Sequence, residues 1–131
     1  MRIAGHGIDV VEVARIARML EEHGERFLDR CFTAAERETG AGSRRRAEHL
    51  AARFAAKEAV LKALGTGLTR GITWTDIEVV PLPTGQPTVR LHAAAQAIAS
   101  DRGITEWHLS LTHTEGHAMA SVIAVATDDA G

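Results

Sequence analysis

Apolar residues recur every three or four positions in two long stretches of this chain, and this period predicts two helices. The first helix is expected over residues 10–23, with Gly24 as its end. The second and longer helix is expected over 44–64, where an alanine-rich sequence of high helix propensity surrounds a stripe of larger apolar residues. The glycines of the segment 65–67 end it, because glycine readily adopts the backbone conformation found just after a helix.

Strands and shorter helices account for the rest of the chain. Residues 2–9 are expected to form a short strand, in which Gly5 and Gly7 mark a place where the backbone approaches a neighbour or a ligand closely. A capping-box pattern at 33–36 predicts a short helix over 34–39. The second half is expected to contain strands over 72–80 and 87–91, a helix over 92–101, and strands over 106–112 and 117–126.

The order of these elements favours an α+β fold over a doubly wound parallel sheet, because strands and helices do not alternate. We expect one domain over residues 1–131, in which a mostly antiparallel sheet packs against the long central helix. A domain of this size leaves much of its surface exposed, so burial of further surface in an oligomer is expected.

Composition excludes several classes of protein. With 45% hydrophobic residues the chain can bury a core, and a net charge of −2 argues against bulk nucleic-acid binding, which needs surplus positive charge. The single cysteine, Cys31, cannot form an internal disulfide. The start has no signal-peptide pattern, and no apolar run is long enough to cross a membrane. We therefore expect a soluble, cytoplasmic protein.

Asp9 is the first candidate for chemistry, because it follows an apolar strand and precedes a predicted helix. One interpretation is a helix N-cap, since aspartate is a preferred capping residue. The other is a carboxylate of a metal or phosphate site, with Gly5 and Gly7 clearing room for a ligand. The residue alone does not decide between them.

The central helix has an unusual set of charges. Glu58 and Lys62 are four residues apart and share a face, which by itself fits a surface ion pair of about 0.3–0.5 kcal/mol. Lys57 falls inside the apolar stripe, so its long side chain must either extend to solvent or find a partner. Arg53 lies on the opposite border of that stripe. Together with the backbone amides of the glycine segment that follows, at Gly65, this helix is typical of a phosphate-binding surface.

His113 ends a strand in which apolar and polar residues alternate. A histidine at a hairpin is most often a solvated turn residue. Ser110 and Thr112 precede it on the same strand end, where functional groups are often found. The other histidines show no spacing typical of metal ligands.

These motifs occur in a familiar order. Gly7-Ile-Asp9, the segment from Arg53 to Lys62, Gly65-Thr-Gly67 and Ser110-Leu-Thr-His113 together resemble the short, single-domain holo-[acyl-carrier-protein] synthases of the 4′-phosphopantetheinyl transferase superfamily. The resemblance implies transfer of 4′-phosphopantetheine from coenzyme A to a serine of acyl carrier protein in fatty acid biosynthesis, with release of adenosine 3′,5′-bisphosphate. It also implies dependence on Mg²⁺ and a homotrimer with active sites between adjacent chains.

The resemblance also assigns roles to residues. It implies that Asp9 and Glu58 bind Mg²⁺ and that Lys62 binds the coenzyme A phosphates and contributes to catalysis. His113, Arg53 and Gly65 would line the coenzyme A site. The carrier protein would dock on the first helix, where Arg15 and Arg18 lie three residues apart and attract an acidic partner.

Two other functions remain open from the residues alone. The same metal chemistry would serve hydrolysis of a nucleotide diphosphate, with water in place of the serine. A non-catalytic module that binds coenzyme A or an acidic protein would keep the basic helix without needing both Asp9 and Glu58.

Overall fold

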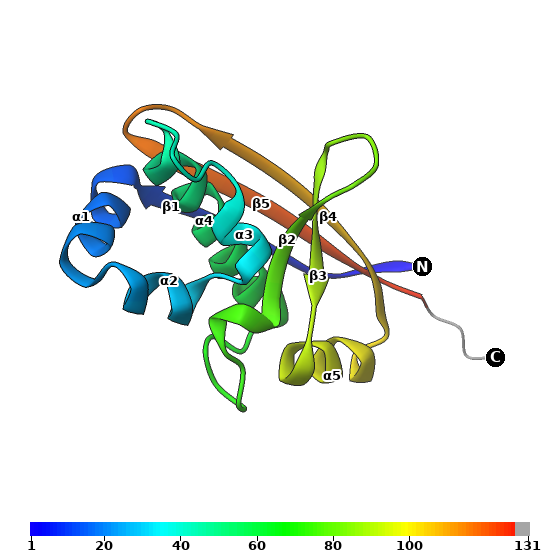
Figure 1. The fold of residues 1–131 in the computed structure, drawn as a ribbon. Coiled ribbons are helices and arrows are strands. Elements are labelled where there is room, and N and C mark those ends of the chain that lie inside the picture. Colours follow the sequence, from blue (N-terminus) through cyan, green and yellow to red (C-terminus); the bar gives the residue numbers. More distant parts are fainter. Residues whose placement is uncertain (128–131) are drawn as a thin grey trace.

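A computed structural model describes residues 1–127 and has an α+β fold (Figure 1). A three-stranded antiparallel sheet has the order β1-β5-β4, and β2 and β3 form a separate antiparallel pair. The long helix α4 packs against β1 and β5 and is almost entirely buried. The elements in chain order are β1 (Arg2–Glu12), α1 (Val13–His23), α2 (Glu25–Cys31), α3 (Ala34–Glu38), α4 (Arg46–Leu64), η1 (Trp74–Asp76), β2 (Ile77–Pro81), β3 (Pro87–Leu91), α5 (Ala93–Asp101), β4 (Ile104–His113) and β5 (His117–Ala126).

The predicted fold class is confirmed, and so is the predicted relation between the sheet and the central helix. The expected boundaries of β3 and β5 match those observed, and β4 is longer by three residues. The capping box of α3 forms as predicted, because the Thr33 side chain accepts from the backbone of Glu36 while Glu36 accepts from the backbone of Thr33. Among the described residues, no helix is both long enough and apolar enough to span a membrane.

The beginning of the chain differs from the prediction. The strand continues through Glu12, which pairs with His117, and α1 begins only at Val13. The spacing of Val10, Val13 and Ile16 fits a helix, but pairing with β5 keeps residues 10–12 in the sheet. The hairpin strand expected from residue 72 is also shorter, since a 3-10 turn occupies 74–76 before β2 begins.

Helix α2 was not predicted at all. It has only seven residues and begins directly after Gly24, without a side-chain cap. Phe27, Leu28 and Cys31 form its buried face and pack into the core. So short an apolar face is too brief to establish a helical period in the sequence, and packing against the core stabilises the helix instead.

Two glycines let β1 approach α4 more closely than any other residue would permit. A Cβ atom added to Gly7 would overlap the carbonyl oxygen of Ala59, and one added to Gly5 would overlap that of Ala63. The predicted close approach is therefore confirmed, but the neighbour is the central helix. The room that Gly5 and Gly7 leave is filled by this helix and is not available to a ligand.

Arg102 links the end of α4 to strand β1 through hydrogen bonds to backbone carbonyl groups. Its guanidinium donates to the carbonyl oxygens of Leu64 at 2.9 Å and Ala63 at 3.3 Å, and to that of Ala4 at 2.6 Å. Carbonyl groups in the last turn of a helix have no partner within the helix, so a cation there satisfies them and interacts favourably with the helix dipole. Gly65 then ends the helix in the left-handed conformation, with φ of 74°, as the sequence predicts.

Lys57 is completely buried and finds its partner in Glu36, which is equally buried. The Lys57 Nζ atom donates to Glu36 Oε1 at 2.7 Å, to the carbonyl oxygen of Trp74 at 3.1 Å and to that of Ile77. The other oxygen of Glu36 accepts from the backbone of Val79 at 2.8 Å. This lysine therefore joins α4 to α3 and β2 inside the core and does not belong to a phosphate-binding surface.

Replacement of Gly7 by alanine should destabilise the protein by about 3 kcal/mol or more, since an added methyl group must push strand and helix apart. The matched control is Gly116→Ala, because Gly116 has nothing within 4 Å of an added Cβ. Urea unfolding of both variants checks the prediction, and equal free energies of unfolding would contradict it.

Candidate active site

Asp9 lies within β1, four residues before α1 begins at Val13, so it does not cap that helix. The cap position belongs to Glu12, whose side chain makes no capping hydrogen bond. Asp9 follows Gly7 on the same face of the strand, which is the face that packs on α4. The helix-cap interpretation is wrong, and the carboxylate is directed toward the central helix.

Lys62 pairs with Asp9 and not with its own helical neighbour Glu58. Its Nζ atom lies 2.9 Å from Asp9 Oδ1 and 3.0 Å from the carbonyl oxygen of Ile8. The Asp9 side chain is 15% exposed and the Lys62 side chain 54%. The ammonium group therefore remains open to solvent on one side, where it can contact an anionic ligand.

Glu58 completes this group of residues. Burial raises the pKa of its carboxyl group above the ordinary value of 4.5, and the neighbouring charge of Asp9 raises it further, whereas Arg15 and Lys62 lower it. A carboxyl group whose pKa is raised by burial and by a neighbouring carboxylate, beside a lysine, is a common feature of functional sites. The group of Asp9, Glu58 and Lys62 is called the acidic site below.

A pocket of about 340 Å³ opens beside the acidic site. Glu58, Lys62 and Gly65 line it together with Gly67, Leu68 and Trp74. An added Cβ at Gly65 or Gly67 would meet nothing within 4 Å, so the backbone of this loop faces open space. The structure thus brings Gly65 to the same pocket as two of the three charged residues, as the phosphate-binding interpretation expects.

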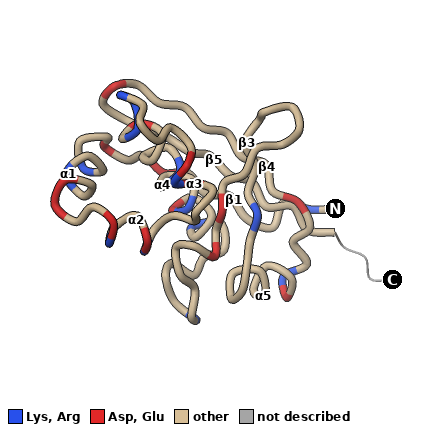
Figure 2. The backbone as a smooth tube through the Cα atoms, viewed as in Figure 1, with Lys and Arg blue, Asp and Glu red and all other residues tan. Residues whose placement is uncertain are grey.

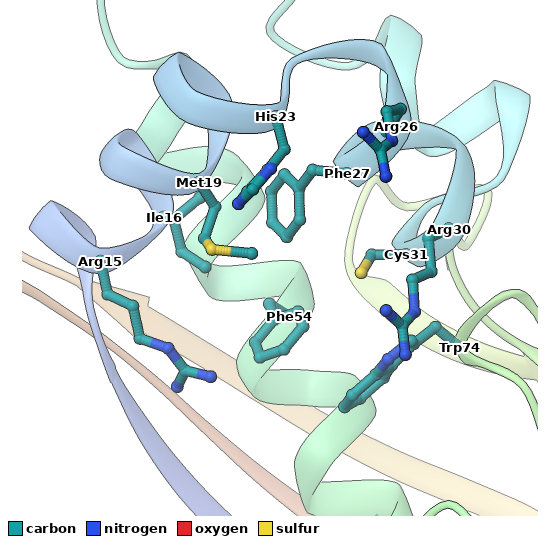
Figure 3. Close-up of a pocket in the computed structure, with 10 residues that line it drawn as sticks. All are labelled: Arg15, Ile16, Met19, His23, Arg26, Phe27, Arg30, Cys31, Phe54 and Trp74. Carbon is teal, nitrogen blue, oxygen red and sulfur yellow. The ribbon is translucent and has the colours of Figure 1, made fainter.

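A second pocket, of about 390 Å³, lies between α1, α2 and α4 and is lined by basic side chains (Figure 3). Its base is apolar and includes Met19, Phe27 and Phe54, and the guanidinium of Arg15 lies 5.6 Å from the centre of the Phe54 ring. Trp74 lines both this pocket and the one beside the acidic site, so the two are neighbours. This pocket is called the basic pocket below.

Three arginines line the basic pocket, namely Arg15, Arg26 and Arg30 (Figure 3). Arg18 is exposed on α1 but does not line it. Sequence reasoning missed Arg26 and Arg30 because it missed α2, although their spacing of four residues would have placed them on one helical face. Elsewhere in the described residues, acidic and basic positions are interspersed along the chain (Figure 2).

Arg53 and His113 lie apart from the acidic site. Arg53 is five positions from Glu58, which places it about 140° around the helix. It lines a third pocket of about 260 Å³ with residues of the β2–β3 hairpin and with Leu111. Its Nη1 atom donates to the carbonyl oxygen of His49 at 3.1 Å, and its buried Nε atom has no partner. Burial lowers the pKa of the guanidinium.

His113 lies near this third pocket, next to the first turn of α4. Its Nδ1 atom lies 3.2 Å from Glu48 Oε1, and its ring centre lies 5.9 Å from that of His49. Neither Glu48 nor His49 stood out in the sequence, because no motif or spacing marks them. Within one chain, therefore, the predicted site residues form two groups on different sides of α4.

The acidic site suits a hard divalent cation. Within residues 1–127 there is no group of three or more histidine, cysteine or acidic side chains that could hold a metal ion by itself. Mg²⁺ needs fewer protein ligands, because it commonly binds one or two carboxylates and completes its octahedron with water and substrate phosphates. Asp9 and Glu58 are the two carboxylates near Lys62 that could supply such ligands, and the charge of Asp9 contributes to the raised pKa of Glu58.

Comparison with known proteins identifies the family. The model of the 4′-phosphopantetheinyl transferase superfamily matches residues 5–122. The holo-[acyl-carrier-protein] synthase of Koribacter versatilis is 49% identical over 121 residues, which cover 92% of this chain and 97% of that protein. The chain belongs to this superfamily.

Solved structures of holo-[acyl-carrier-protein] synthases share the fold. The protein from Neisseria meningitidis superposes with a TM-score of 0.85 at 31% identity, covering 95% of this chain and 99% of that one. The protein from Bacillus anthracis, solved in complex with CoA (3′,5′-ADP), gives a TM-score of 0.78 at 35% identity and covers 95% and 98%. The resemblance read from the motifs is therefore confirmed, and this chain is an enzyme of the holo-[acyl-carrier-protein] synthase family.

A pH series tests the environment of Glu58 in this phosphopantetheinyl transferase. Because its pKa is raised on folding, the folded state holds this proton more tightly than the unfolded state, and that stabilisation is lost as pH rises through the folded pKa. In chelator-treated protein, Glu58→Gln should therefore gain stability relative to wild type as pH increases from about 4 to neutrality. Added Mg²⁺ should reduce this difference in stability between Glu58→Gln and wild type. Urea unfolding at each pH measures it, and a difference independent of pH would refute this environment.

Proposed function

We propose that this chain transfers 4′-phosphopantetheine from coenzyme A to a serine of apo-acyl carrier protein and releases adenosine 3′,5′-bisphosphate. We also propose that residues 1–131 act as one phosphopantetheinyl transferase domain in the cytoplasm. The observation that carries the proposal is the acidic site. Asp9 of β1 pairs with Lys62 of α4 from 53 residues away in the sequence, and Lys62 lines one open pocket together with Glu58.

The chemistry is a displacement at phosphorus. The serine oxygen attacks the phosphorus that bears pantetheine, the bond from this phosphorus to the bridging oxygen breaks, and adenosine 3′,5′-bisphosphate leaves with that oxygen. Positioning and neutralisation of charge dominate such a reaction. The serine proton passes to a carboxylate of the site or to water.

Each residue of the acidic site has a role in this scheme. Asp9 and Glu58 would hold Mg²⁺, which supplies positive charge to the diphosphate when bound. Lys62 lies on the exposed side of Asp9, where its ammonium can stabilise the charge that develops on the leaving phosphate. Gly65 would leave room for the same diphosphate at the end of α4, since an added Cβ there would meet nothing within 4 Å, while its own amide donates within the helix cap to Leu61 and Lys62.

The rest of coenzyme A requires a second group of residues. Arg53, with an unpartnered buried nitrogen beside the third pocket, and His113 carry the guanidinium and ring nitrogens suited to its remaining phosphate. Since they lie on another side of α4, we propose that the acidic site of one chain faces Arg53 and His113 of an adjacent copy. A homotrimer with sites between chains satisfies this arrangement.

The outer face of the main sheet is suited to such an assembly. Ile8 and Val10 of β1 are 50% and 53% exposed, and Met119 of the neighbouring strand β5 is 38% exposed. Apolar side chains from adjacent strands on one open face are typical of a contact surface between subunits. They lie on the opposite face of β1 from Asp9, so contact through this face leaves that carboxylate directed toward α4.

A mass-spectrometric assay tests the function directly. Wild-type protein incubated with coenzyme A, Mg²⁺ and apo-acyl carrier protein should increase the mass of the carrier protein by one phosphopantetheine group. Asp9→Ala and Glu58→Ala should abolish this transfer, and Lys62→Ala should slow it by about 10²-fold or more while leaving the fold intact. Release of nucleotide without carrier protein would favour a hydrolase, and binding of coenzyme A without turnover would favour a non-catalytic module.

The basic pocket is the surface to which we assign the carrier protein. Its apolar base and arginine rim fit an acidic partner with an exposed apolar patch, and it adjoins the acidic site through Trp74. The charge reversals Arg15→Glu and Arg18→Glu in one variant should raise KM for the carrier protein strongly and weaken its dependence on salt. The same reversal at Arg90, on the β2–β3 hairpin, is the control and should have no effect.

Arg15 also lowers the pKa of Glu58, so the variant above can disturb the acidic site as well. Reversal of Arg26 and Arg30 avoids this, because α2 lies at the other end of the basic pocket (Figure 3). It should raise KM for the carrier protein about tenfold and leave KM for coenzyme A nearly unchanged. An unchanged carrier-protein KM in both variants would move the docking surface elsewhere.

A further inference from the structure

His113 is held from two directions by side chains of the first turn of α4. Glu48 Oε1 lies 3.2 Å from its Nδ1 atom, and the His49 ring contacts it edge to face with 5.9 Å between ring centres. The Glu48 side chain is 16% exposed and that of His113 29%. A partly buried carboxylate and a neighbouring ring therefore restrict an imidazole that ends the strand β4.

The hydrogen bond determines which ring nitrogen remains for a ligand. An ionised carboxylate only accepts hydrogen bonds, so Nδ1 of His113 must be the donor. The other nitrogen, Nε2, makes no hydrogen bond to any of residues 1–127. A phosphate oxygen accepts hydrogen bonds, so Nε2 must also carry a hydrogen to bind one, as both ring nitrogens do in the charged form of histidine. A carboxylate that accepts from Nδ1 holds the ring in one orientation for such a contact.

His49 is itself kept in place. Gly40 has a positive φ of 73°, and a Cβ added there would come within 2.9 Å of the His49 ring. Burial lowers the pKa of His49, and the neighbouring charge of Arg53 lowers it further. His113 is therefore held in place by packing against His49 as well as by its hydrogen bond to Glu48.

We propose that Glu48 is a positioning residue that presents the Nε2 atom of His113 to a phosphate of coenzyme A. The inference rests on the proposed function and extends it by one residue. The exposed pair of His108 and Glu106 provides a contrast, because it has a similar distance of 3.1 Å but side chains that are 63% and 52% exposed.

This role makes a kinetic prediction that a merely structural role does not. His113 would contact a part of coenzyme A distant from the reacting phosphorus, so its orientation affects substrate binding equally in the ground and transition states. Glu48→Ala should then raise KM for coenzyme A about tenfold, as outer residues that orient a ligand typically do, with kcat within about twofold. KM for the carrier protein should not change.

Two further variants make the test specific. Glu48→Gln should retain most of the affinity, because its amide oxygen still accepts from Nδ1. Addition of Glu48→Ala to His113→Ala should weaken coenzyme A binding no further than His113→Ala alone, since Glu48 acts through His113. Glu106→Ala is the control and should match wild type.

The possible outcomes distinguish a failure of the role of Glu48 from a failure of the proposed function. An unchanged KM for coenzyme A in Glu48→Ala, or additive effects in the double variant, would overturn the role of Glu48 while leaving the proposed function intact. A wild-type protein that makes no holo-acyl carrier protein would overturn the proposed function instead. If Glu48→Ala does not fold, Glu48→Met keeps the length of the side chain without a strong acceptor and carries the same expectation.

Discussion

The close packing of β1 on α4 is the contact on which the rest of the structure depends. Gly5 and Gly7 lie against the backbone of Ala63 and Ala59, so the strand meets the helix without intervening side chains. Two residues of a strand and four of a helix advance by similar lengths, about 6–7 Å. This match lets two successive small residues on each element meet in register. Asp9 is the next residue on the same face of the strand. The side chain of Lys62, which lies between Ala59 and Ala63 on the helix, then reaches Asp9.

How much of this could be predicted from the sequence depends on the range of the interactions involved. Long periodic segments such as α4, and the hairpin formed by β4 and β5, were predicted closely because local patterns determine them. The end of β1 could not be predicted, since residues 10–12 fit a helix equally well. Only pairing with residues 117–119 of β5 keeps them extended. Helix α2 depends on burial of three residues in a core that the sequence does not reveal.

The site shows the same division. The motifs identified the acidic and basic residues, and the position of Lys57 in an apolar stripe indicated that its side chain extends to solvent or finds a partner. That partner is Glu36, which lies 21 residues away in the sequence and can be identified only from the fold. The pairing of Lys62 with Asp9 spans 53 residues, and the pairing of His113 with Glu48 spans 65. Spacing within one helix cannot predict contacts of this kind, because both residues of each pair also have possible partners that are closer in the sequence.

The buried ion pair links these contacts to the shape of the active site. Removing one partner of such a pair costs about 3–5 kcal/mol, because a charge is left unpaired in the core. Lys57 also donates to the carbonyl oxygen of Trp74, and the side chain of Trp74 forms the wall shared by the basic pocket and the pocket of the acidic site. A lysine that touches neither pocket therefore positions the residue between them. Helix α4 thus directs its charges to three places: Lys57 into the core, Glu58 and Lys62 toward β1, and Glu48 and Arg53, from its first half, toward His113 and the third pocket. Arg53 is five positions from Glu58 and nine from Lys62, which places it about 140° and 180° around the helix from them. This separation is the physical reason for our proposal that the complete site lies between copies of the chain.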